Sequence, residues 1–385
     1  MKIAIFINDY LKKNVGGGFS FLSRMIEVID NYTFTSEYEI CFLVKTKSND
    51  DLSKLNKSVI EYDSKLKLSK KHFFYKKKYD EILLIEETLR SYKIDLLYFI
   101  TPETYEINFP YIINNWDLGH RSCYSFPELC MNSTYEFREQ NLVRSLRKSI
   151  AVVTESKAGK DELLNYLHLY SSKVFILPIF SGKITSLNYN FDLKNKVLKK
   201  YKIDKKFLIY PAQFWSHKNH YNLILAFNLM IVKGYDFELV LTGSDKGNLN
   251  YITDVVNQLK LENRVKFLGF VDEIELLVLY KNATSLVYPS LLGPTNMPIL
   301  EAYELNIPVA CSDLPGHREI TNNQALYFNP LEPKDMCETI IKSIGFTYEI
   351  PCEIITNMQI GAKIESIFDE ILKYRKVFGL NFKQF

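Results

Sequence analysis

The chain has 385 residues, more than one hydrophobic core usually organises, so we expect two domains of roughly 150 to 200 residues each. Its 47% hydrophobic and 24% charged residues are ordinary for a globular protein and exclude wholesale disorder. The 48 Lys and Arg residues against 45 Asp and Glu residues leave a net charge of +3, which is too balanced for a protein that binds nucleic acid along its length. We therefore expect no nucleic-acid partner.

The six cysteines lie far apart in the sequence and form no C-x-x-C pair. This spacing is typical of reduced thiols in a cytoplasmic protein and unlike that of a zinc site. The opening run MKIAIFIND is too short for a signal peptide, and no other apolar stretch is long enough to span a bilayer. The sequence thus predicts a soluble, cytoplasmic protein.

Short apolar runs alternate with longer amphipathic segments along the whole chain, which predicts an α/β fold built on parallel sheets. The first half contains six runs of strand length, at residues 2–7, 39–44, 95–100, 111–114, 150–154 and 173–178. Residues 181–201 are polar, lose this pattern and predict a linker. Six more runs follow, at residues 207–212, 237–243, 265–271, 285–289, 308–313 and 325–330.

This organisation predicts two Rossmann-like, doubly wound domains, residues 1–185 and 200–345, facing a cleft. Residues 346–385 follow as a C-terminal helical segment, with apolar residues at helical spacing from Ile364 to Leu372. Ligands of open parallel sheets bind at the carboxyl ends of the strands, so we expect the site in the loops that follow them.

One segment is strongly basic, with seven lysines from Lys65 to Lys78 around the aromatic residues Phe73, Phe74 and Tyr75. Such a segment is typical of a contact with an anionic membrane surface, where each lysine contributes about 1 kcal/mol. It is equally typical of a solvated loop in a lysine-rich chain, and both interpretations stay open.

A glycine run, Gly16, Gly17 and Gly18, follows the first predicted strand and precedes an amphipathic helical segment. Glycines let a backbone approach a ligand, and the amide groups of a helix N-terminus suit a phosphate. The run is neither G-x-G-x-x-G nor a P-loop, so a turn without a ligand fits it as well.

The segment PAQFWSHKNH, residues 211–220, places Lys218 where a helix begins after a predicted strand. An ammonium beside helix N-terminal amides would neutralise a diphosphate leaving group. By position alone, an ordinary surface lysine is the simpler interpretation.

The segment GPTNMPILEA, residues 293–302, forms a turn and then the first turns of a helix that contains Glu301. The two oxygens of Glu301 suit the two hydroxyls of a ribose. A glutamate placed there by the helix dipole is the alternative.

These three segments, in this order, resemble the nucleotide-sugar-dependent glycosyltransferases of family 4 (glycosyl transferases group 1), which have the GT-B fold. The resemblance covers nearly the whole chain and is most specific over residues 207–330, where YPAQFWSHKNH, LTGSD, VKFLGFV, GPTNMPILEA and VACSDLPGHREI follow in the family's order and spacing. The segment NNWDLGHRSCYSFPEL, residues 114–129, is similar to the family's catalytic loop.

The resemblance implies retaining transfer of a hexose from a nucleoside-diphosphate sugar to a hydroxyl of a glycan or lipid-linked acceptor, in the synthesis of surface polysaccharide or lipopolysaccharide. It implies a donor bound by the second domain, an acceptor bound by the first, and a last helix that packs back on the first domain. A lipid-linked acceptor would bring Lys65–Lys78 to the inner face of the cytoplasmic membrane. We favour GDP-mannose or a UDP-hexose as donor, although no residue type fixes the base or the sugar.

Carried over position by position, the resemblance assigns the donor site to ten residues: Gly17, Gly18, Gln213, Lys218, Phe270, Val271, Thr295, Asn296, Met297 and Glu301. Lys218 would hold the diphosphate and Glu301 the ribose. Asp117 and His120 are the catalytic candidates, with a turn cap and a core histidine as the respective alternatives. Because the chain contains no D-x-D sequence, we expect neither a metal nor another cofactor.

Three positions depart from the resembled family. Trp116 stands where it often has histidine, Gln213 where it commonly has arginine, and Gly293 where it commonly has glutamate. They mark either a subgroup or reduced activity. The alternatives to a transferase are a degenerate nucleotide-sugar-binding subunit of a partner transferase and a GT-B epimerase or phosphorylase.

Overall fold

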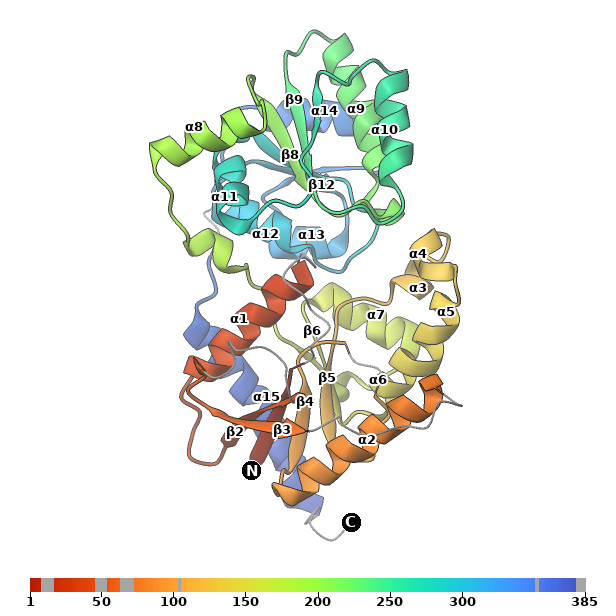
Figure 1. Cartoon of the computed structure of the whole chain (residues 1–385), viewed down its shortest axis with the longest axis vertical. Helices are drawn as coiled ribbons and strands as arrows, with labels where there is room; N and C mark the ends of the chain where they lie inside the picture. Colours follow the sequence, from red (N-terminus) through yellow and green to blue (C-terminus); the bar gives the residue numbers. More distant parts are fainter. Residues whose placement is uncertain (8–16, 46–53, 63–72, 103–104, 350–352, 379–385) are drawn as a thin grey trace.

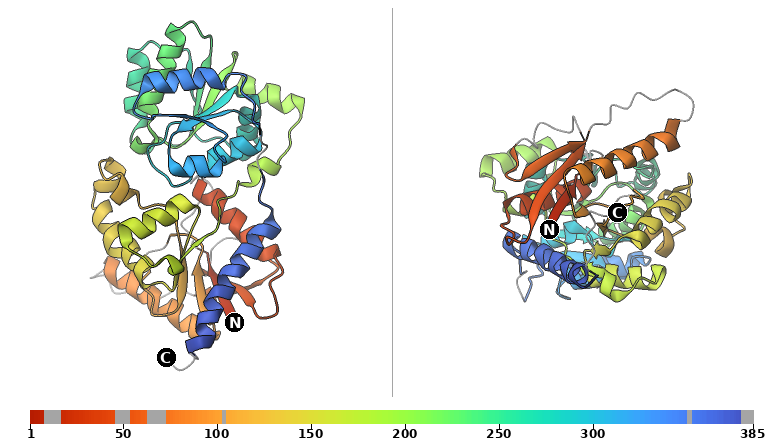
Figure 2. Two further views of the ribbon diagram at one scale, coloured as in Figure 1. Left: turned by 180° about the vertical axis from the view of Figure 1, so that it is seen from behind. Right: turned by 90° about the horizontal axis from the view of Figure 1, so that it is seen from below.

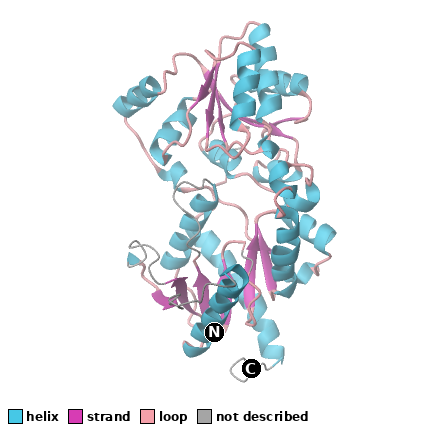
Figure 3. Cartoon of the chain, turned by 45° about the vertical axis from the view of Figure 1, so that its right-hand side comes forward, coloured by secondary structure: helices cyan, strands magenta, loops and turns pink. Residues whose placement is uncertain are grey.

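Two parallel β-sheets, each flanked by helices, lie one above the other along the long axis of the molecule (Figure 1). The computed structural model describes residues 1–7, 17–45, 54–62, 73–102, 105–349 and 353–378. Figure 3 shows the strands inside each half and the helices around them. The predicted fold class, two parallel-sheet α/β domains, is confirmed.

The first sheet has seven strands in the order β3-β2-β1-β4-β5-β6-β7, and every neighbouring pair is parallel. Its strands are β1 (Lys2–Phe6), β2 (Glu39–Lys45), β3 (Ser58–Tyr62), β4 (Leu96–Phe99), β5 (Tyr111–Asn115), β6 (Ala151–Thr154) and β7 (Val174–Ile176). The central strands are continuous apolar runs because helices cover both faces of the sheet. The strand order changes direction between β1 and β4, which makes this a topological switch point.

The helices of the first domain are α1 (Gly17–Asn31), α2 (Phe73–Ser91), α3 (Gly119–Ser122), α4 (Pro127–Cys130), α5 (Thr134–Phe137), the π-helical segment η2 (Arg138–Val143), α6 (Arg144–Lys148) and α7 (Lys157–Leu167), with a 3-10 turn at Ser171–Lys173. Helix α1 buries Phe21, Met25, Val28 and Ile29 against the sheet. Spacings of four and three residues place these side chains on one helix face, which is why this segment forms a helix there.

The second sheet has six strands in the order β10-β9-β8-β11-β12-β13, again all parallel. Its strands are β8 (Phe207–Pro211), β9 (Glu238–Thr242), β10 (Val265–Phe267), β11 (Ser285–Tyr288), β12 (Val309–Ser312) and β13 (Leu326–Phe328). Its helices are α8 (Phe191–Lys200), α9 (His220–Val232), α10 (Leu249–Gln258), α11 (Glu273–Asn282), α12 (Met297–Glu304), α13 (Pro315–Ile320) and α14 (Pro333–Ser343), with 3-10 turns at Lys183–Ser186 and Ser216–Lys218. The switch point of this sheet lies between β8 and β11.

The last helix, α15 (Asn357–Phe378), follows the second domain in sequence but packs on the first (Figure 2). Ile364 and Phe368 are fully buried in the core shared with α1. The Tyr32 hydroxyl donates to Glu365 at 2.8 Å. A Cβ on Gly361 would lie 2.1 Å from the Tyr32 ring, so only glycine permits this close approach.

Three features differ from the sequence expectations or fall outside them. Strand β3 was not predicted, because its alternating burial and edge position give it no continuous apolar run. Part of the expected linker is helical, since α8 packs on the core of the second domain through Val197. The basic segment falls largely outside the described residues, because 63–72 are not described and its remainder begins α2. No helix within the described residues has the length and apolar character needed to cross a membrane.

Candidate active site

Loops that follow strands of the two sheets meet at the boundary between the domains. Lys218 follows β8 and residues 293–301 follow β11, the strands on either side of the second switch point. Asp117 and Glu155 follow β5 and β6 of the first sheet. The Thr295 hydroxyl donates to Glu155, and the charge of Asp117 acts on Lys218. The structure therefore brings together the loops in which we expected the site.

The Lys218 ammonium is partly buried and lies between two side chains of the second domain. It donates to Asn296 Oδ1 at 2.9 Å and to the Tyr288 hydroxyl at 3.3 Å. Burial lowers the pKa of Lys218 to about 8, against the opposing influence of the Asp117 carboxylate. A partly buried ammonium held by neutral oxygens is a group that an anionic ligand would stabilise.

Glu301 is buried in α12 and is only 6% exposed. The Tyr280 hydroxyl donates to its Oε2 at 3.1 Å, and its Oε1 lies 3.2 Å from where a Cβ on Gly182 would stand. Burial raises the pKa of Glu301 to about 7, although the hydrogen bond from Tyr280 opposes the shift. Each carboxylate oxygen has two acceptor positions, so these contacts leave room for ribose hydroxyls.

Two helix N-termini approach each other beside Gly182. Thr295, Asn296 and Met297, which lead into α12, are 8%, 7% and 7% exposed. A Cβ on Gly182 would lie 3.7 Å from Met297 Sδ and 3.3 Å from Ser20 Cβ of α1. Gly17 and Gly18 lie in the first turn of α1, and among the described residues no atom outside this turn lies within 4 Å of a Cβ built on Gly17. Figure 1 shows this end of α1 at the domain boundary, where its amides and those of α12 suit an anion.

The three remaining predicted donor-site residues, Phe270, Val271 and Gln213, differ in burial and in hydrogen bonding. Phe270 is 53% exposed on the loop between β10 and α11, where its ring is free to stack on a base. The Val271 side chain is buried in the core of the second domain, so this residue would offer a ligand only its backbone. Gln213 Oε1 accepts a hydrogen bond from Trp215 Nε1 at 3.0 Å.

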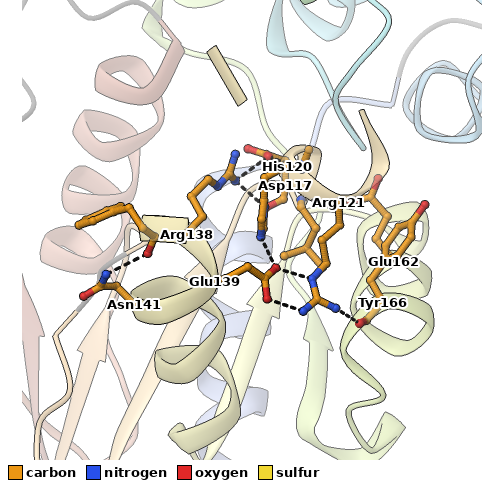
Figure 4. A network of polar contacts seen from close by, with 11 residues as sticks. Asp117, His120, Arg121, Arg138, Glu139, Asn141, Glu162 and Tyr166 are labelled. Carbon is orange, nitrogen blue, oxygen red and sulfur yellow. Dashed lines mark hydrogen bonds and ion pairs between the residues drawn. The ribbon is translucent and has the colours of Figure 1, made fainter. Parts of the chain in front are cut away.

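Asp117 is held as an ionised carboxylate by its own domain (Figure 4). Its Oδ1 accepts hydrogen bonds from Arg138 and from the Gly119 amide, both at 2.7 Å. Burial disfavours the charge, but Arg138 and Gly119 outweigh it and lower the pKa of Asp117 below its usual value. The side chain is 31% exposed, so it remains accessible to a ligand.

His120 is fully buried, and its Nε2 lies 2.9 Å from Glu139 Oε1. The Arg121 guanidinium binds both oxygens of the same Glu139 carboxylate, at 2.6 Å each (Figure 4). Burial and the charge of Arg138 lower the pKa of His120 below its usual value. These contacts favour the core interpretation of His120 and leave Asp117 as the better catalytic candidate.

Three further candidate residues beside Asp117 were missed from the sequence: Glu155, Glu162 and Arg138. Burial raises the pKa of Glu155 and of Glu162 to about 7, and the charge of Asp117 adds to both shifts. Glu155 follows the predicted strand at 150–154, so its position was a usable indication. Arg138 lies in the π-helical segment η2, and no sequence pattern indicated a π-helix there.

Two further carboxylates, Glu128 and Glu319, join the domains by polar contacts. Glu128 Oε1 of α4 accepts from the His217 amide at 2.9 Å and lies 2.6 Å from His217 Nδ1. Glu319 of α13 accepts from the amides of Lys157 and Ala158, at 2.7 and 3.1 Å, at the start of α7. A carboxylate at a helix N-terminus is favourable, so the second contact stabilises the arrangement of the domains.

Gly293 has a structural reason to differ from the family's glutamate. Its φ is +124°, and a Cβ there would lie 2.8 Å from both Asn296 Nδ2 and the Thr295 carbonyl oxygen. Glycine adopts this conformation without strain, and any side chain would displace Asn296 from Lys218. Gly293 and Asn296 therefore depend on each other, which favours a subgroup over a damaged site.

Within the described residues, no group of three or more His, Cys, Asp or Glu side chains is placed to hold a metal ion. The groups positioned for an anion are Lys218 and the helix N-termini.

The chain is similar in sequence to proteins of one known family. Residues 194–344 match the family model of the glycosyl transferases group 1. The O-antigen chain mannosyltransferase RfbU of Salmonella typhimurium is 31% identical over 211 residues, 53% of each chain. O-antigen chain mannosyltransferase B of Escherichia coli is 24% identical over 232 residues, 58% of this chain and 59% of the relative. The matches thus span a little over half the length of these relatives.

The fold extends over nearly the whole chain. Anabaena Alr3699/HepE, solved in complex with UDP and glucose, superposes with a TM-score of 0.64 and 15% identity, covering 97% of this chain and 99% of that one. Two parallel-sheet α/β domains make up the GT-B fold, and this chain has that fold. The resemblance to the glycosyl transferases group 1 is confirmed, and it is the match of residues 194–344 to the model of that family that confirms it. Membership of family 4 in particular stays a prediction.

Proposed function

We propose that the protein is a glycosyltransferase that moves a hexose from a nucleoside-diphosphate sugar to a hydroxyl of a glycan or lipid-linked acceptor. The observation that carries the proposal is the Lys218 ammonium, which lies partly buried after β8 and beside the turn that begins α12. The family match of residues 194–344 supports it, because this match includes the whole Lys218 and Glu301 region.

In the proposed reaction, the bond between the anomeric carbon and the diphosphate oxygen breaks, and the electron pair leaves with the diphosphate. Lys218 and the amides at the start of α12 stabilise the negative charge that develops there. Because these groups supply positive charge at the leaving group, we propose that transfer needs no metal ion.

The acceptor hydroxyl bonds to the anomeric carbon and gives up its proton. We propose retention, with attack from the face that the diphosphate leaves and proton transfer to the departing phosphate oxygen. Asp117 is ionised and accessible on the first domain, so it would orient the acceptor hydroxyl as a hydrogen-bond acceptor. Glu155 accepts a hydrogen bond from the Thr295 hydroxyl. Because its pKa is about 7, its carboxyl group would be partly protonated near neutral pH and could give or take a proton there.

The relatives suggest which substrates to test first. RfbU and mannosyltransferase B are named as O-antigen chain mannosyltransferases, so we propose GDP-mannose as the first donor and UDP-hexoses as the second. We further propose a role in the synthesis of O-antigen or a related surface polysaccharide, on the cytoplasmic side of the membrane. A peripheral contact through Lys65–Lys78 stays a prediction from the sequence.

The test combines donors, acceptors and chelator. The purified chain is incubated with GDP-mannose or UDP-hexoses and with free and polyprenyl-linked saccharides, in EDTA and in magnesium. We expect one donor class to give a product of one added hexose in EDTA, with the anomeric configuration of the donor by NMR. Lys218→Met should abolish transfer. No donor binding and no transfer would refute the proposal, and binding without transfer to any acceptor would favour a nucleotide-sugar-binding subunit.

A further inference from the structure

The Asn296 amide lies between Lys218 and a buried histidine, His317 of α13. Its Oδ1 accepts from the Lys218 ammonium at 2.9 Å and from the Tyr288 hydroxyl at 3.2 Å. Its Nδ2 lies 2.9 Å from His317 Nε2 and donates more weakly to the Leu292 carbonyl at 3.4 Å. The oxygen of the amide thus faces donors, and its nitrogen faces acceptors.

The hydrogen bonds of His317 determine which ring nitrogen carries the proton. Nδ1 lies 2.8 Å from the Ser312 carbonyl oxygen, which can only accept, so Nδ1 is the donor. Nε2 of the neutral ring then offers its lone pair to the Asn296 amide. His317 is 0% exposed, and burial lowers its pKa to about 4, so the ring is neutral at ordinary pH.

We propose that His317 is a positioning residue of the donor site: its neutral imidazole fixes the orientation of the Asn296 amide, which holds the Lys218 ammonium for a diphosphate. This inference rests on the proposed function, because it takes the ligand of Lys218 to be a nucleoside diphosphate. His317 itself touches neither the diphosphate nor the sugar.

The need for His317 follows from the two-fold symmetry of an amide. If the Asn296 side chain turned by half a rotation, its NH2 group would face the Lys218 ammonium, and two donors would oppose each other. The Tyr288 hydroxyl does not prevent this, because a hydroxyl donates or accepts equally well. The Leu292 carbonyl is too distant to decide at 3.4 Å. Apart from Lys218 itself, His317 Nε2 is therefore the group that favours one orientation over the other.

The first experiment compares variants of His317 with a matched control. His317→Leu removes the acceptor, whereas His317→Gln keeps a side-chain oxygen that can accept from Asn296. His220 is equally buried in the same domain, and within the described residues neither of its ring nitrogens has a hydrogen-bond partner, so His220→Leu is the control. We expect the Kd of the nucleoside diphosphate, by calorimetry, to rise about tenfold or more in His317→Leu. It should stay within about threefold of wild type in the other two variants.

A second readout reports on Lys218 without any ligand. Competitive labelling with acetic anhydride and peptide mass spectrometry gives the pKa of this one lysine in each variant. When Asn296 Oδ1 no longer faces it, the partly buried ammonium is less stable, so the pKa of Lys218 should fall by about one unit in His317→Leu. A lost packing contact alone would not produce this shift, and His220→Leu should not show it.

The third measurement is made on the wild-type protein, so its result does not depend on a variant with altered packing. In wild-type protein labelled with 15N-histidine, His317 should be the neutral Nδ1–H tautomer from pH 5 to 8, assigned by comparison with His317→Gln. An Nε2–H tautomer, or an unchanged pKa of Lys218 and unchanged nucleotide affinity in folded His317→Leu, would overturn the inference. If the wild-type protein binds no nucleoside diphosphate, the proposed function fails. The pKa of Lys218 from competitive labelling and the tautomer of His317 from NMR still decide whether His317 orients Asn296.

Discussion

Alkaline pH should weaken nucleoside diphosphate binding through the loss of one proton from Lys218. In the ligand-free protein its pKa is about 8 rather than 10.5, and a bound diphosphate favours the charged form. Affinity should therefore be full below about pH 8 and fall about tenfold for each pH unit above it. If the bound diphosphate restores the ordinary pKa of 10.5, the loss reaches about 300-fold, on the order of 3 kcal/mol.

Calorimetric titrations from pH 7 to 10 test this with two variants of Lys218. In Lys218→Arg the guanidinium keeps its charge over this pH range. Any change of affinity with pH that remains in this variant therefore comes from ionisation of the nucleobase or of other protein groups. Lys218→Met should bind weakly, with the same shallow pH dependence as Lys218→Arg. The reasoning is refuted if wild type and Lys218→Arg follow one pH profile, or if Lys218→Met binds as tightly as wild type at pH 7.

Three further variants test other parts of the site. The pKa of Glu301 is raised to about 7, so ionising this buried carboxyl group lowers the stability of the folded protein as pH rises from 4.5 through 7. Glu301→Gln removes this cost and should raise the free energy of unfolding at pH 8, measured in urea, by up to about 3 kcal/mol. The same variant should weaken donor binding. Asp117→Asn should lower kcat about 100-fold or more, with the Kd of the donor changed less than about threefold. Glu319→Ala removes the carboxylate from the Lys157 and Ala158 amides, which should cost about 1 kcal/mol and speed proteolysis between the domains.

The fold was predictable because buried parallel strands are continuous apolar runs, and twelve of them were found by that property. Strand β3 escaped because an edge strand buries alternate residues only, as Ile60 and Tyr62 do here. Helix α8 escaped because it is mostly polar and buries chiefly Val197. Both are elements whose apolar surface is too small to stand out from the sequence around them.

The site was predictable only as far as it follows strand ends within one domain. Lys218, Asn296 and Glu301 were predicted in this way; Lys218 does contact Asn296, and Glu301 lies in the helix that begins beside Asn296. The contact between Thr295 and Glu155 joins residues 140 positions apart, and no local pattern encodes such a contact. The difference between the accessible Asp117 and the buried His120 likewise depends on tertiary packing.

The carboxylate of Asp117 acts on charged groups of both domains. Its negative charge raises the pKa of Glu155 and Glu162 on its own side and opposes the lowering of the pKa of Lys218 across the boundary. A diphosphate that enters the site would meet direct repulsion from Asp117. It would also meet a more cationic Lys218 and two nearby carboxyl groups kept closer to neutral by the same charge. These effects oppose each other, so neutralising Asp117 should leave donor affinity nearly unchanged and reduce the step in which the acceptor hydroxyl reacts.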